Sequence, residues 1–163
     1  MITADELHRV LHYDPETGYF IWLVRPGKRV GAGQLAGCID AHGYRSIRFG
    51  NVRHYGHRLA WLYMTGQHPP KYIDHANGNP ADNRWANLRA ATQAQNNANA
   101  KLRRNNTSGL KGACWDPRNG RWKAQIIVSG RTTHLGRFKS KEEAHSAYLA
   151  AARELYGEFA RAG

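Results

Sequence analysis

The 163-residue chain is poor in acidic residues and cysteine and has no long apolar run. Only 12 Asp and Glu stand against 24 Lys and Arg, so the formal net charge is +12 at pH 7 and the pI is near 10.2. No apolar stretch approaches the roughly 20 residues of a membrane-spanning helix, and we expect no membrane span. The two cysteines, Cys38 and Cys114, lie far apart, which excludes a disulfide framework and a zinc site built on cysteines.

The polar N-terminal segment lacks the charged start, apolar run and cleavage site of a secretory signal, so we expect a cytoplasmic protein. With 41% hydrophobic residues, the chain can fold into one or two small domains despite its charge. A polyanion is the expected partner, because Lys and Arg that neutralise phosphates release condensed counterions. Nucleic acid is therefore favoured over a membrane surface or an acidic protein.

The positive charge is uneven along the chain. From residue 101 onward 13 Lys and Arg accompany 5 Asp and Glu, whereas residues 1–100 hold 11 and 7. A polar, basic stretch at residues 100–109 is typical of a linker between the two parts. We therefore predict one domain at residues 1–104 and a second at residues 105–163.

The first part predicts a small α+β arrangement. A capping-box pattern at Thr3 to Glu6 predicts a short helix, and Gly66 is placed to end a second helix over residues 57–63. Strands are predicted at the ranges 19–23, 44–49 and 52–56.

Two turn signals and one helix start define the last part. Asn119-Gly120 is the residue pair preferred in type I′ hairpins, and Ser129-Gly130 marks a second tight turn. A capping-box pattern at residues 140–143 precedes alanine-rich helical spacing. We predict a three-stranded antiparallel sheet packed on one helix, with strands at 112–115, 121–128 and 132–138.

A segment rich in oxygen ligands begins at Asp74-His75 and runs through several Asn and Asp residues to Asn97. A hard cation such as Mg²⁺ prefers carboxylate and amide oxygens together with water. A neighbouring histidine can take a proton from water near neutral pH. On chemistry alone, an ordinary Asn- and Gly-rich loop with an uninvolved histidine explains the same residues.

The order of the motifs resembles the HNH homing endonucleases of phages, which have a ββα-metal nuclease fold. The resemblance rests on a series of short segments: His57-Arg58-Leu59-Ala60-Trp61, Ile73-Asp74-His75, Asn77-Gly78, Asp82-Asn83-Arg84, Asn87-Leu88-Arg89 and residues 92–99.

Roles are implied by this resemblance for four residues. Asp74 and Asn96 would bind the metal, His75 would be the general base and Asn87 would orient His75. Asn97 is the rival for the second ligand position, because the two amides are adjacent. We prefer Asn96, since Thr92, Asn96 and Asn99 share one helical face.

The resemblance also implies the reaction. We expect hydrolysis of phosphodiester bonds in double-stranded DNA with Mg²⁺ or another divalent cation such as Mn²⁺. Because one Asp-His pair is present, we expect a monomer that nicks one strand at a time. If a phage encodes the protein, its place is the infected bacterial host cell.

The last part resembles the DNA-binding domain of plant ethylene-response factors, a sheet that enters the major groove. The resemblance rests on Gly112, Trp115, the 122–126 segment, the 135–138 segment and Ala147-Tyr148. By match, the candidates to contact DNA are Lys111, Trp115, Arg118, Arg121, Trp122, Lys123, Gln125, Arg131 and Thr133. Cys114 departs from the pattern, because it stands where the plant domains have an arginine that reads DNA.

The prediction is an α+β protein with an HNH nuclease domain and an ethylene-response-factor-like domain, acting as a site-preferring nickase of homing type. One alternative is a non-catalytic DNA-binding regulator that retains the nuclease scaffold. Another is a protein that binds or cleaves RNA.

Overall fold

The computed structural model describes residues 2–102, 105–128 and 130–162. It has a mixed α+β fold with several antiparallel sheets. The chain forms two compact units, Met1–Ala91 and Thr92–Gly163, which are described separately. The predicted boundary at residues 104 and 105 stays a prediction, because residues 103 and 104 lie outside the described part.

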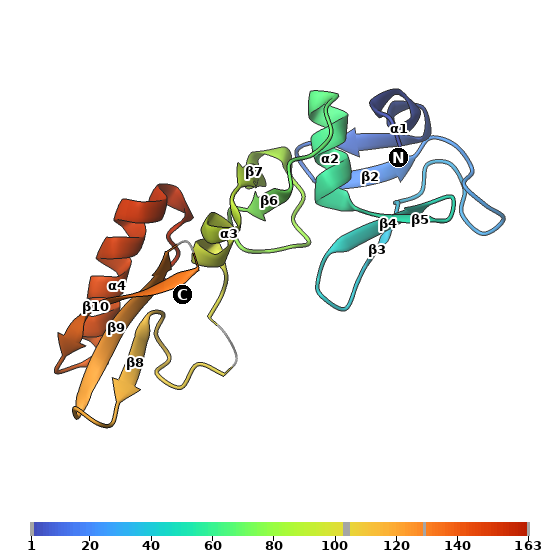
Figure 1. Cartoon of the computed structure of the whole chain (residues 1–163). Coiled ribbons are helices and arrows are strands. Elements are labelled where there is room, and N and C mark those ends of the chain that lie inside the picture. Colours follow the sequence, from blue (N-terminus) through green and yellow to red (C-terminus); the bar gives the residue numbers. More distant parts are fainter. Residues whose placement is uncertain (1, 103–104, 129, 163) are drawn as a thin grey trace. The chain divides into compact units, whose positions relative to one another are not determined.

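The first unit contains three antiparallel sheets of short strands and two α-helices (Figure 1). Its elements are α1 (Ala4–Val10), β1 (Leu11–Asp14), β2 (Tyr19–Trp22), β3 (Cys38–Ile39), β4 (Arg45–Phe49), β5 (Val52–Tyr55), α2 (Gly56–Thr65), β6 (Tyr72–His75), the 3₁₀ turn η1 (Trp85–Asn87) and β7 (Leu88–Ala91). The sheets are β1-β2, β3-β4-β5 and β6-β7.

Local signals place both helices of this unit where the sequence predicts them. The Thr3 hydroxyl accepts from the Glu6 amide, and the Glu6 carboxylate accepts from the Thr3 amide, which completes the predicted capping box of α1. Gly66 ends α2 with a φ of 68°. Beneath them, Leu7, Leu11, Tyr13, Phe20 and Ile47 are almost completely buried and form the centre of the core.

The second unit holds a three-stranded sheet in the order β10-β9-β8, with α4 along one face (Figure 1). Its elements are α3 (Gln93–Asn99), β8 (Ala113–Asp116), β9 (Arg121–Val128), β10 (Arg131–Phe138), α4 (Lys141–Tyr156) and the 3₁₀ turn η2 (Gly157–Phe159). Ala113 and Ala124 on the sheet pack with Ala144 on α4. Small side chains let the helix approach the sheet closely, as the alanine spacing predicts.

Two local details differ from the prediction. Residues 117–120 separate β8 from β9, close to the gap between the predicted strands, so the hairpin is present, but its four-residue loop is longer than the type I′ turn that Asn119-Gly120 favours. The Asn119 side chain donates to Asp116 Oδ2 and closes this longer loop. At α4, Ser140 caps the Glu143 amide, but the Glu143 carboxylate accepts from the Lys139 amide and not from that of Ser140. Ser129 of the predicted second turn lies outside the described residues.

Helices in the described part of the chain are all too short or too polar to cross a membrane.

Candidate active site

The β6-β7 pair carries the predicted Asp-His motif. Asp74 lies opposite Arg89 and His75 opposite Leu88, and both motif residues are buried. Arg89 Nε donates to Asp74 Oδ2 over 2.8 Å, which holds the carboxylate by a charged hydrogen bond. The strand ends at His75, and a turn closed by the Gly78 amide and the His75 carbonyl oxygen follows at once.

Asn83 is a partner of the His75 ring. His75 Nε2 lies 3.1 Å from Asn83 Oδ1, and Asn83 is 1% exposed. An amide oxygen can only accept a hydrogen bond, so this contact places the ring proton on Nε2. Nδ1 is then the unprotonated ring nitrogen.

Burial sets the charge of the two histidines at this site. It lowers the pKa of His75, an effect opposed by the hydrogen bond to Asn83 and by the charges of Asp74 and Asp82. The ring of His57 lies 5.2 Å from that of His75, and burial lowers the pKa of His57 to about 3. Both rings are therefore neutral near pH 7.

Asn83 is held in place from the N-terminal strands. The Tyr13 hydroxyl donates to the Asn83 carbonyl oxygen over 2.6 Å. Gly18 has a φ of +73°, and a Cβ there would lie 2.5 Å from the Asn83 carbonyl carbon. Only glycine therefore fits at position 18. The sequence analysis placed Asn83 in one of the HNH-like segments but gave it no role. No local pattern indicates that a residue eight positions after His75 contacts its ring.

Asn87 closes the loop that follows His75. Its side-chain oxygen accepts from the Asn77 amide over 2.9 Å, and its Nδ2 donates to the Asp82 carbonyl oxygen over 2.7 Å. Its own carbonyl oxygen accepts from the Ala76 amide. These bonds brace the backbone on both sides of Asn83, and the predicted support of His75 by Asn87 stays a prediction.

The two rival amides on α3 have different surroundings. Asn96 Oδ1 is buried and lacks a hydrogen-bond partner within the described residues. Asn97 is exposed, and its Oδ1 accepts from Gln93 Nε2 over 3.1 Å. An unsatisfied buried oxygen is costly unless a ligand completes it, so Asn96 is the better candidate for a cation ligand.

No cluster of three or more His, Cys, Asp or Glu side chains suited to a metal occurs in the described ranges. A cation held by one carboxylate oxygen and one amide oxygen uses a different donor set, one that suits Mg²⁺ with water and substrate phosphate as further ligands.

The predicted DNA contacts on β9 lie on two different faces of the sheet. Ala124 and Ile126 are buried, and Ala124 packs with Ala144 of α4. Because alternate residues of a strand point to opposite faces, Arg121, Lys123 and Gln125 lie on the face turned away from α4.

The remaining candidates around the sheet differ in position. Trp122 packs in the core, and its ring centroid lies 5.4 Å from that of Trp115, which is 50% exposed. Arg118 lies in the 117–120 loop, and Arg131 and Thr133 are exposed on β10.

Two further residues share the open face of the sheet. His134 pairs with Gln125, and Arg137 pairs with Lys123. The sequence analysis did not include them among the DNA contacts, because the face of a β10 residue depends on its register with β9, and for Arg137 also on the irregularity between His134 and Gly136.

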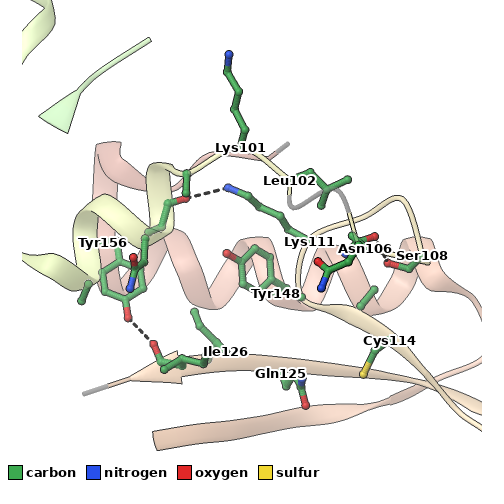
Figure 2. Close-up of a pocket in the computed structure, with 18 of the residues that line it drawn as sticks. Lys101, Leu102, Asn106, Ser108, Lys111, Cys114, Gln125, Ile126, Tyr148 and Tyr156 are labelled. Atoms are coloured by element: carbon green, nitrogen blue, oxygen red, sulfur yellow. Dashed lines mark hydrogen bonds between the residues drawn. The ribbon is translucent and has the colours of Figure 1, made fainter. Parts of the chain in front are cut away.

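Lys111 points inward. It is buried, and its ammonium group donates to the carbonyl oxygens of Ala98 over 3.0 Å and Arg161 over 3.2 Å. It lines a cavity of about 710 Å³ together with residues of α3, β8, β9 and α4. Figure 2 shows Lys101 pointing away from Lys111. Burial lowers the pKa of Lys111, and these bonds favour a structural role over the predicted DNA contact.

Comparison with known proteins defines the class. Residues 54–98 match the family model described as HNH endonuclease, a span that includes Asp74, His75, Asn87 and Asn96. The chain is 36% identical over 106 residues to Protein 3.8 of Escherichia phage T7, covering 64% of this chain and 87% of that protein. The chain belongs to the HNH endonuclease family.

A second relative is named Uncharacterized HNH endonuclease L560 and comes from Acanthamoeba polyphaga mimivirus. It is 34% identical over 106 residues, which cover 64% of this chain and 54% of the relative, so the chain spans about half of that protein. No solved structure matches.

Proposed function

We propose that the protein is a divalent-metal-dependent endonuclease that hydrolyses phosphodiester bonds in duplex DNA, a nickase of homing type. The observation that carries this proposal is a buried, neutral His75, with its Nε2 bound to Asn83, next to Asp74 within the span that matches HNH endonuclease. Because both relatives are viral proteins, the infected cell is the proposed setting.

His75 acts as the general base in this proposal. Asn83 holds the proton on Nε2, so Nδ1 removes a proton from the attacking water as the water oxygen bonds to phosphorus. The 3′ oxygen of the neighbouring nucleotide leaves with the electron pair of the broken P–O bond. Asn87 supports the base by closing the loop after it.

Asp74 on β6 and Asn96 on α3 are the proposed metal ligands, as the resemblance to the ββα-metal nucleases implies. The carboxylate of Asp74, oriented by Arg89, and the unsatisfied Oδ1 of Asn96 are each the kind of oxygen ligand that a hard cation such as Mg²⁺ or Mn²⁺ prefers. Such a cation, when bound, supplies Lewis-acid stabilisation of charge on the phosphate and the departing oxygen.

Nicking of supercoiled plasmid DNA tests this function. In Mg²⁺ the full chain is expected to convert supercoiled plasmid to the open-circular form before any linear form appears, since the chain has one Asp-His pair. EDTA should stop the reaction without releasing the protein from DNA. Undiminished cutting in EDTA would remove the metal from the mechanism, and binding without cutting would favour the non-catalytic regulator.

The open face of the β8-β9-β10 sheet is the proposed DNA anchor, as in the ethylene-response-factor domain. Arg121, Lys123 and Gln125 lie there with Arg137. A two-stranded ribbon or sheet fits the major groove, and Arg is the commonest reader of guanine. Trp115, Arg118, Arg131 and Thr133 remain proposed contacts at the margins, while Trp122 is proposed to support the hairpin from inside.

Removal of two cations from this face should reduce the salt dependence of binding. For Arg121→Gln/Lys123→Gln we expect the slope of log K against log salt to fall by about 1.8, because each neutralised phosphate contributes about 0.9 to that slope. The control variant Lys139→Gln/Arg153→Gln removes one Lys and one Arg that lie off this face in the same unit. Fluorescence anisotropy in EDTA measures the slope for each variant. Equal slopes for the two variants would show that the open face of the sheet is not the DNA-binding surface.

A further inference from the structure

A groove of about 930 Å³ lies in the first unit, outside the span that matches HNH endonuclease. Residues of the loop after β2 line it together with residues of β3, β4 and β5. Its lining includes the apolar side chains of Val24, Val30 and Leu35 and four cationic side chains. Leu35 is 49% exposed, so the apolar part is open to solvent.

The loop that forms one side of the groove is organised by Arg25. Its guanidinium donates to the carbonyl oxygens of Gly27 over 3.1 Å and Lys28 over 2.8 Å, and a β-bridge joins Gly27 to Val30. These bonds keep Arg25 within its own turn, which presents Lys28 and Arg29 to solvent.

Two other cations of this region are also engaged. Arg45 is buried, its Nη1 donates to the Ala36 and Gly37 carbonyl oxygens, and its guanidinium lies over the Tyr19 ring. Gly37 has a φ of +79°, and a Cβ there would lie 2.4 Å from the Ser46 carbonyl oxygen, so the loop lies directly against β4. Arg53 forms an ion pair with Asp40.

Three exposed cations of the groove remain. Lys28, Arg29 and Arg48 have no ion pair with a carboxylate in the described part of the chain. Unpaired cations gathered in one groove attract an anion with several charges. The apolar side chains beside them suit the deoxyribose rings that separate the phosphates of a nucleic-acid strand.

Strand β4 connects the groove to the proposed general base. The ring of Tyr44, just before β4, lies 6.0 Å from the His75 ring, and Arg48 is four residues farther along. At about 3.3 Å per residue, the Cα atoms of Tyr44 and Arg48 are about 13 Å apart. With about 3.4 Å of rise per nucleotide, Arg48 is within reach of a phosphate roughly three to five nucleotides from the one at His75.

We propose that this groove binds the sugar-phosphate backbone of the DNA substrate a few nucleotides from the scissile phosphate, through Lys28, Arg29 and Arg48. This inference rests on the proposed nuclease function. It adds a second DNA-binding site to the unit that contains His75. This site would hold the cut strand close to His75 independently of the C-terminal sheet.

Matched charge variants of the full chain test the groove. Lys28→Gln/Arg48→Gln should lower the slope of log K against log salt by about 1.8 for duplex DNA, and Arg48→Gln alone by about 0.9. The control Arg9→Gln/Lys71→Gln removes one Arg and one Lys that are exposed elsewhere in the same unit. Its slope should stay within about 0.5 of the parent slope.

Replacing single DNA phosphates with uncharged methylphosphonates shows which phosphate contacts the groove. A methylphosphonate placed roughly three to five nucleotides from the mapped nick should weaken binding of the parent protein severalfold and leave the double variant unaffected. Equal slopes for groove and control variants, with nicking retained, would overturn the groove and leave the nuclease function standing. Normal binding and slope changes without cleavage would overturn the nuclease function alone, and absence of DNA binding by every form would overturn both.

Discussion

His75→Ala should lower the rate of plasmid nicking by about a hundredfold or more, the usual range for removal of a general base. DNA affinity should change little, because His75 is buried and contributes no formal charge near neutral pH. Single-turnover nicking at saturating protein measures the rate, and anisotropy in EDTA measures the affinity. A variant that nicks at the parent rate would remove His75 from the chemistry.

The neighbouring histidine supplies a control for this result. His57 lies beside His75, but its pKa of about 3 makes it a poor base near neutral pH. His57→Gln should therefore reduce the rate by less than about tenfold. An equal reduction in both variants, with both folded by circular dichroism, would mean that packing and not proton transfer explains the effect.

The contact with Asn83 predicts which nitrogen of the His75 ring carries the proton. Nitrogen-15 NMR of the parent protein without DNA should show the His75 ring protonated at Nε2, because Asn83 Oδ1 accepts from that atom. Asn83→Ala should give a mixture of tautomers and a lower nicking rate at unchanged DNA affinity. A ring protonated at Nδ1 in the parent protein would contradict the proposed orientation, whatever the rate of cleavage.

Asp74→Ala should abolish Mg²⁺-dependent nicking while DNA binding persists. The reason is the removal of the carboxylate proposed to hold the cation. The change also removes the partner of Arg89, so folding must be checked by thermal denaturation. Nicking by a folded Asp74→Ala protein at the parent rate would exclude Asp74 as a ligand.

The variant Asp74→Asn distinguishes the proposed role of Asp74 as a metal ligand from its role as the hydrogen-bond partner of Arg89. The amide oxygen can still accept from Arg89 Nε, as Asp74 Oδ2 does over 2.8 Å, but it lacks the charge that a hard cation prefers. This variant should keep the parent melting temperature and require a higher Mg²⁺ concentration for half-maximal rate. A Mg²⁺ requirement equal to that of the parent would show that the charge of Asp74 is unnecessary.

Local chemistry explains which elements were predictable. The capping box of α1, Gly66 after α2 and the hairpin between β8 and β9 depend on residues within a few positions of one another. The bonds that hold the 117–120 loop were not predictable, because Asp116 accepts from the Asn119 side chain and from Arg137, a residue on another strand. A pattern of two residues cannot report a bond to a distant strand.

The candidate site divides in the same way. Asp74 and His75 were recognisable as adjacent residues in an ordered series of motifs, which the match to HNH endonuclease over residues 54–98 supports. The role of Asn83 was invisible, since its position depends on Tyr13, which lies 70 positions away in the chain. The preference for Asn96 over Asn97 gains support from an unsatisfied buried oxygen that no sequence pattern displays.

The amino-acid sequence alone determined the excess of positive charge, the helix starts and the order of the nuclease motifs, because each is a property of composition or of neighbouring residues. Only the tertiary structure decided which cations are exposed: Lys111 points inward to backbone carbonyl groups, whereas Lys28 and Arg48 line an open groove. All three side chains carry the same charge in the sequence. Their difference arises from strand register and loop packing, which bring distant carbonyl groups and carboxylates to some cations and leave others to solvent.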